Sequence, residues 1–306
     1  MEERRKIIEK AHCYFRNHKK QNALPPAIKV ASNFAEFATK EDKPQEVNTL
    51  ETYAKKHSID WYGGEGLHLN APEYKALHAI FEIFQEQELA LQDYSEEQRR
   101  ELYKKIAGND YSECFVVLID KNDFAKRIYS GAKGGFERKS VDFILAKLSQ
   151  IIMLTFGTDG NPRIVNPIRV DLPIFDNYSI VFLNKEIFSV GNNFILFPRI
   201  FVPKMQKSKP LEYNLFYVLA LEMKHHYKSP CFEYRISYNT LKRKIARNKR
   251  YQRVTNIKND FNEAIANLID YNMIQEYKEE TLPDGNKICV FTINRENYTK
   301  MIAAHA

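Results

Sequence analysis

The segment Leu241–Asp270 has the sequence LKRKIARNKRYQRVTNIKNDFNEAIANLID, which predicts a short basic helix, a basic turn and a longer amphipathic helix. In the longer helix, apolar residues recur at the i, i+4, i+7 and i+8 spacing that places them on one buried face. They are Ile257, Phe261, Ala264, Ile265, Leu268 and Ile269. The opposite face begins with side chains that can bond to phosphates or base edges, namely Thr255, Asn256, Lys258, Asn259 and Asn262. The alternative is an ordinary core helix with a solvated face.

Positive charge gathers around this segment. The chain carries a net charge of +7, yet 14 Lys and Arg stand against 3 Asp and Glu between Lys204 and Lys258, and the rest has 32 against 36. A surplus concentrated in so short a stretch predicts a polyanionic partner that docks there. The cations expected to hold phosphates are Lys242, Arg243, Lys244, Arg247, Lys249, Arg250 and Arg253.

Composition excludes several other classes. A chain of 306 residues with 44% hydrophobic content is long enough for two domains with cores of their own. It has neither an apolar run long enough to span a bilayer nor the apolar region of a secretory signal, so a cytoplasmic location is expected. Its four cysteines form no CxxC pair that would suggest a zinc site, and those at 114, 231 and 289 are expected to be small buried residues.

The order of predicted elements occurs twice and indicates an α+β fold, mainly helical. In each copy a helix precedes a short strand, two further helices and a β-hairpin, which is the layout of a winged helix. Asp120 and Ser237 are the expected N-caps after the two strands. We therefore predict an N-terminal helical arm and linker at 1–60, a first winged-helix domain at 61–200 and a second at 201–306. A proline-containing connection, Pro198–Pro210, is the expected hinge between the copies.

No catalytic motif stands out in the sequence. HExxH, GxSxG and Walker patterns are absent, so we expect no enzyme activity, no cofactor and no metal. The loop GAKGG (131–135) lies between two predicted helices rather than after a strand, and it is expected to be a turn near which Lys133, Arg138 and Lys139 make auxiliary contacts with phosphate. A nuclease or relaxase with a metal site elsewhere remains an alternative.

Two resemblances to known families agree with this layout. The segments LEYNLFYVLALEM, FEYRISYNTLKRKI and YQRVTNIKNDFNEAIANLIDYNMIQEY, within Leu211–Tyr277, resemble the second domain of tandem winged-helix plasmid replication initiators of the Rep superfamily. The segments GLHLNAPEYKALHAIFEIF (66–84) and FERKSVDFILAKLSQIIMLTFGTD (136–159) are similar to the second plasmid-encoded protein of chlamydial virulence plasmids, a family associated with plasmid replication and maintenance.

These resemblances imply a bacterial, plasmid-associated protein that binds double-stranded DNA at origin repeats. The second domain would bind most tightly, with Lys287 in the wing beside Asp284–Gly285 following the backbone. The first domain would form a homodimer, add DNA contacts and recruit a replicative helicase. A transcriptional regulator, a plasmid partition or maintenance factor, and a protein-interaction module or effector without DNA binding are the alternatives.

Overall fold

A computed structural model describes residues 2–21, 25–39, 69–108, 111, 113–129, 135–151, 153–156, 162–175, 177–188, 194–199, 201, 208–246 and 249–304. The chain divides into a first unit, residues 1–31 with 75–206, and a second unit, residues 32–74 with 207–306. The boundary between Gln206 and Lys207 falls within the connection that the sequence predicts as a hinge. In this division the N-terminal segment is shared between the two units.

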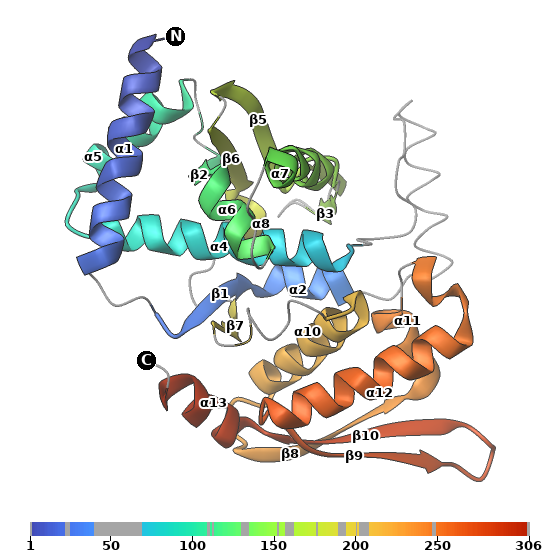
Figure 1. The fold of residues 1–306 in the computed structure, drawn as a ribbon. Coiled ribbons are helices and arrows are strands. Elements are labelled where there is room, and N and C mark those ends of the chain that lie inside the picture. Colours follow the sequence, from blue (N-terminus) through green and yellow to red (C-terminus); the bar gives the residue numbers. More distant parts are fainter. Residues whose placement is uncertain are drawn as a thin grey trace. The chain divides into compact units, whose positions relative to one another are not determined.

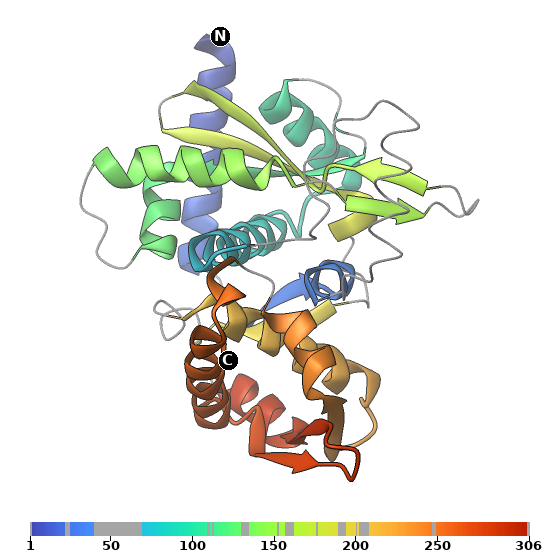
Figure 2. The ribbon, with the colours of Figure 1, turned by 90° about the vertical axis from the view of Figure 1, so that its right-hand side faces the viewer.

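The first unit contains most of the elements of the chain (Figure 1). They are α1 (Glu2–Gln21), β1 (Ala27–Ala31), α4 (Ala71–Ala90, whose first four residues belong to the second unit), α5 (Glu96–Ala107), β2 (Cys114–Asp120), α6 (Lys121–Ile128), α7 (Gly135–Leu148), β3 (Met153–Phe156), β4 (Pro162–Val165), β5 (Ile168–Phe175), β6 (Tyr178–Asn184), α8 (Lys185–Phe188) and β7 (Phe194–Pro198). Strand β1 pairs with β7, and the hairpin β3–β4 extends away from the sheet β2–β6–β5 (Figure 2).

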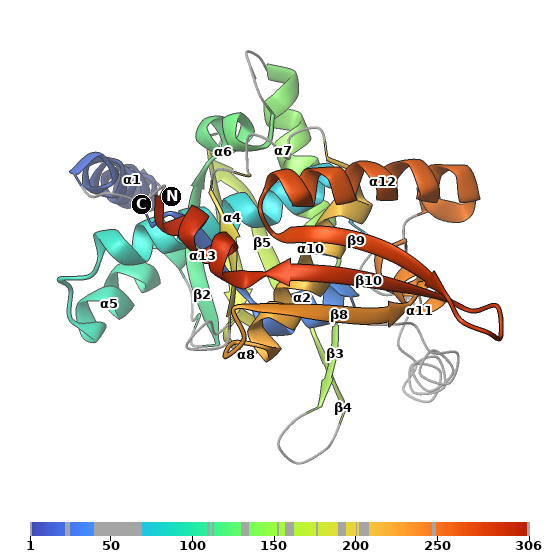
Figure 3. The same cartoon turned by 90° about the horizontal axis from the view of Figure 1, so that it is seen from below.

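The second unit is built around one helix that is buried on nearly all sides, α10 (Pro210–His225). Its other elements are α2 (Ser32–Thr39), β8 (Cys231–Ser237), α11 (Tyr238–Ile245), the 3-10 turn η2 (Lys249–Gln252), α12 (Val254–Asp270), β9 (Ile274–Thr281), β10 (Lys287–Asn294) and α13 (Arg295–Ala304). Seen from below, β10 lies between β8 and β9, and α12 runs beside β9 (Figure 3).

The chain is an α+β protein with small antiparallel sheets. In both units a strand is followed by two helices, and two later strands complete a three-stranded sheet whose middle strand is the last in sequence, β6 in β2–β6–β5 and β10 in β8–β10–β9. The first unit differs in having α5 before β2 and the hairpin β3–β4 before β5. In each copy a strand of 7 residues leads directly into a helix of 8 residues. The expected caps are confirmed, since Asp120 accepts from the backbone of Asn122 and Asp123, and Ser237 accepts from that of Thr240.

Helix α1, the start of the expected N-terminal helical arm, packs into the core of the first unit. Ile8, Ala11 and Phe15 are buried in the same cluster as residues of α5, β2 and β6. The Arg4 guanidinium donates to the backbone carbonyls of Ile106 and Ala107 at the C-terminal end of α5. A cation is favourable there because the last carbonyls of a helix carry partial negative charge.

Two glutamines of α4 bond to the backbone of two strands in the first unit. The Gln85 amide donates to Lys29 O in β1 and accepts from Lys29 N, with both distances 3.0 Å. The Gln87 amide makes the same pair of bonds with Leu118 in β2, at 2.6 and 3.2 Å. Because β2 is an edge strand, the buried Gln87 satisfies peptide groups that no neighbouring strand reaches.

Candidate nucleic-acid interface

Helix α10 fixes the position of the segment α11–η2–α12. The Asn214 amide donates to Ile245 O, the last carbonyl of α11, at 3.1 Å. The backbone N–H of Leu211 donates to the Tyr251 hydroxyl in η2, also at 3.1 Å. Asn214, Leu211 and Tyr251 are buried, so these bonds form away from solvent and hold both ends of the basic turn against the core.

A second set of contacts joins the basic turn to α12. Arg250 Nε lies 2.7 Å from Asp260 Oδ2, and Arg250 Nη2 lies 3.2 Å from Asp260 Oδ1. The bond to Asp260 raises the pKa of the Arg250 guanidinium. The Asn256 amide donates to the backbone carbonyl of Arg250 at 2.9 Å. Arg250 and Asn256, both expected to contact DNA, are thus engaged in holding the turn on the helix.

The outward side of α12 keeps its expected polar character. Thr255, Lys258, Asn259 and Asn262 are exposed and follow the i, i+3, i+4, i+7 spacing of one helix face, which we call the exposed face of α12. None of the four is hydrogen-bonded or ion-paired to another residue within the described ranges. Arg253 is also exposed and stands at the N-cap of the helix.

The opposite side of α12 is buried as predicted, with one correction. Ile257, Phe261, Ala264, Ile265 and Leu268 are buried. Ile269 is 40% exposed, because the last turn of α12 rotates it out of the stripe that Leu268 occupies. The cysteine prediction was also only partly right, since Cys289 is buried, Cys114 is half-buried and Cys231 is exposed.

The remaining expected phosphate-binding residues lie in several environments. Lys242 is half-buried, and the exposed Arg243 donates to Thr240 Oγ1 at 3.1 Å. Lys244 is half-buried, with Nζ 3.4 Å from Thr39 O at the C-terminal end of α2. Arg247 lies outside the described residues, and for Lys249 only the backbone is described.

The β9–β10 hairpin carries more acidic than basic residues, which disfavours contact with the DNA backbone. From Ile274 to Asn294 it carries four acidic residues, Glu276, Glu279, Glu280 and Asp284, against Lys278 and Lys287. Lys287 Nζ lies 3.4 Å from Glu279 Oε2, and Lys278 Nζ lies 2.8 Å from Glu276 Oε2. Both lysines are therefore paired within the hairpin.

The auxiliary phosphate contacts expected in the first unit fall where no side chain is described. Lys133 and most of the GAKGG loop lie outside the described residues. Arg138 and Lys139 lie in the first half of α7, for which only the backbone is described. Their contact with DNA stays a prediction.

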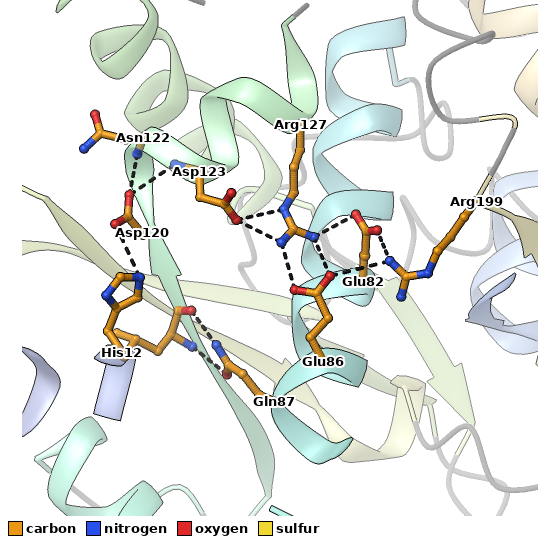
Figure 4. A network of polar contacts seen from close by, with 10 residues as sticks. His12, Glu82, Glu86, Gln87, Asp120, Asn122, Asp123, Arg127 and Arg199 are labelled. Carbon is orange, nitrogen blue, oxygen red and sulfur yellow. Dashed lines mark hydrogen bonds and ion pairs between the residues drawn. The ribbon is translucent and has the colours of Figure 1, made fainter. Parts of the chain in front are cut away.

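The first unit also contains a network of charged side chains, centred on Arg127 of α6 (Figure 4). Arg127 Nη1 lies 2.8 Å from Glu82 Oε2, and Arg127 Nη2 lies 2.8 Å from both Glu86 Oε2 and Asp123 Oδ2. Arg199 pairs with Glu82 and lies 3.5 Å from Glu86. The carboxylates of Glu82, Glu86 and Asp123 are thus paired with guanidinium groups. Among the described residues no cluster of side chains could hold a metal ion.

Beside this network, His12 of α1 connects Asp120 and Tyr178. His12 Nε2 lies 3.4 Å from Asp120 Oδ2, and His12 Nδ1 lies 3.4 Å from the Tyr178 hydroxyl. Burial and the nearby carboxylates of Asp120 and Glu9 raise the pKa of Tyr178. His12 and Asp120 border a polar cavity of about 250 Å³, and the contact between them joins α1 to the end of β2.

Comparison with known proteins gave no identification. A scan against protein-family models and a search of curated proteins both found no match. Among the described helices, none combines the length and apolar character needed to cross a membrane.

Proposed function

We propose that this chain is a sequence-specific, double-stranded DNA-binding protein that initiates plasmid replication at origin repeats. Its DNA-binding element is a winged helix formed by α10, β8, α11, α12, β9 and β10. The order of these elements and the sheet order β8–β10–β9 support this proposal. The protein works in the bacterial cytoplasm, associated with its plasmid, and its role is binding rather than catalysis.

The observation that carries the proposal is the exposed face of α12 and its position directly after the basic segment. Four side chains with hydrogen-bonding capacity project outward on a helix whose other side is anchored in the core. This face begins at the end of the stretch from Lys204 to Lys258, which holds 14 Lys and Arg against 3 Asp and Glu. A DNA major groove accommodates an α-helix and presents base edges to its side chains.

The contacts within the chain refine the roles of the expected residues. Thr255, Asn259 and Asn262 face the bases, and Arg250 and Asn256 position the turn rather than contact DNA. Lys244 contacts the C-terminal end of α2 rather than DNA. Lys287 does not contact phosphate, because it pairs with Glu279 in an acidic hairpin. The phosphate contacts come from Lys242, Arg243, Arg247, Lys249, Arg253 and Lys258.

The first unit also has a strand, two helices and two later paired strands, and it supplies the accessory functions. We propose that it forms the homodimer, that Lys133, Arg138 and Lys139 add phosphate contacts, and that it recruits the replicative helicase. Direct repeats in the bound DNA would favour an initiator, and a single palindrome would favour a transcriptional regulator. Mapping the bound sites next to the gene separates these functions, and a chain that binds no DNA would be an interaction module or effector.

Replacing Arg253 and Lys258 together by alanine is expected to weaken binding to all duplexes. Each lost phosphate contact lowers the slope of log K against log salt by about 0.9, so the double variant should lose about 2 units of slope. The measurement is fluorescence anisotropy of the full chain with a labelled duplex between 50 and 200 mM salt, about the range in which this effect is large.

Lys300→Ala is the matched control, since Lys300 is an exposed lysine of the same unit on α13, where it pairs with Glu296. Its slope should equal that of the unmodified chain. An unchanged slope in the double variant, or an equal loss in the control, would contradict the placement of the phosphate contacts at the start of α12.

A further inference from the structure

The first residue of α12 has an apolar side chain that is largely exposed to solvent. Val254 is 67% exposed, and valine is a weaker helix former than leucine or alanine, so helix propensity does not account for its place here. Next to it, the exposed Thr255 adds a second methyl group. In the major groove the only apolar group on a base edge is the C5-methyl of thymine, which valine and threonine side chains can contact.

Further along the same helix, two exposed amide side chains lie on the same face as Thr255. Asn259 and Asn262 are three residues apart, and Thr255 stands four residues before Asn259, so all three lie on one face. An asparagine amide bonds in bidentate fashion to N6 and N7 of adenine. Asn256 is not part of this set, because its amide donates to Arg250 O.

The side chains that commonly recognise guanine are nearly absent from α12. The helix VTNIKNDFNEAIANLID contains no arginine, and Lys258 is its one cation. Bidentate arginine or lysine contacts to O6 and N7 of guanine are the most frequent base-specific contacts in protein–DNA complexes. Because α12 has few side chains that recognise guanine and has exposed methyl and amide groups, it is better suited to A·T than to G·C base pairs.

We propose that α12 recognises A·T base pairs in the major groove, with Val254 and Thr255 against thymine methyls and Asn259 and Asn262 on adenines. This inference rests on the proposed DNA binding and specifies its ligand as A·T-rich duplex. The preference resides in the major-groove edge, which distinguishes it from recognition of a narrow minor groove, where A·T pairs present only acceptors.

The test starts from duplexes selected by the full chain out of a random library, followed by base analogues within the selected site. Inosine·cytosine pairs present the major-groove edge of G·C and the minor-groove edge of A·T. Replacing A·T pairs by inosine·cytosine should weaken binding roughly 5- to 150-fold for each contacted adenine. Replacing thymine by uracil removes only the methyl and should weaken binding about 3- to 5-fold per buried methyl.

A double-mutant cycle assigns the methyl contact. In Val254→Ala, uracil substitution should have a smaller effect than in the unmodified chain, because the partner of the methyl is gone. Selected sites rich in G·C, or full binding to the inosine·cytosine duplex, would overturn the inference while leaving DNA binding intact. Absence of binding to any duplex would overturn the proposed function itself.

Discussion

Arg127→Ala is expected to lower the free energy of unfolding by about 3–5 kcal/mol, the cost typical of removing one partner from a buried ion pair. The Arg127 side chain is 11% exposed and bridges Glu82 and Glu86, which are 15% and 8% exposed. Burial opposes the charge of Arg127, yet the bond to Glu86 and the charges of Glu82 and Asp123 outweigh this effect and raise its pKa. Without Arg127, two carboxylates one helical turn apart would remain buried with Arg199 as their main counter-charge.

Urea unfolding followed by circular dichroism measures this cost. Arg5→Ala is the control, since Arg5 forms an exposed pair with Glu9 and its loss should change stability by less than about 1 kcal/mol. Adding Glu86→Gln to Arg127→Ala should restore part of the lost stability by removing one unpaired charge. Equal costs for the two arginine variants would show that the network of Figure 4 contributes no more than surface charge.

His78→Gln is expected to reduce the acid sensitivity of the chain. Burial lowers the pKa of His78 from 6.5 to about 3. In the unfolded chain His78 binds a proton below about pH 6.5, whereas in the folded chain it binds one only below about pH 3. The contribution of neutral His78 is therefore complete above pH 6.5 and is lost as pH falls toward 3, with a slope of about 1.4 kcal/mol per pH unit.

The measurement is the free energy of unfolding at several values between pH 3 and pH 7.5, about the window set by the two pKa values. The difference between His78→Gln and the unmodified chain should change in favour of the variant as pH falls. If this difference stayed constant across the range, His78 would be protonated inside the folded protein.

Local signals predicted much of the fold, because they depend on residues close in sequence. Asp120 and Ser237, the expected caps, begin helices α6 and α11. The buried stripe of α12 follows from helical spacing alone. The roles of Arg250 and Asn256 could not be predicted, because the sequence does not show whether a side chain faces solvent or bonds within the chain.

One signal could have corrected the assignment of Arg250. Asp260 lies on the buried side of α12, three residues after Ile257 and four before Ala264. A carboxylate in such a stripe requires a cationic partner, and a basic turn just before the helix is the nearest source. The packing of α1 was harder to predict from the sequence. Its apolar stripe of Ile8, Ala11 and Phe15 does not indicate which other elements cover it.

The central claim is that the exposed face of α12 recognises the DNA sequence, and one ratio tests it most directly. This ratio compares the affinity of the full chain for its selected duplex with that for a scrambled duplex of equal length, measured at one salt concentration. In the variant Asn259→Ala/Asn262→Ala the ratio should fall by at least about 10-fold, since each bidentate amide contributes about 1–3 kcal/mol of discrimination, while affinity for the scrambled duplex stays constant. An unchanged ratio, or an equal loss on both duplexes, would contradict the assignment of sequence recognition to α12.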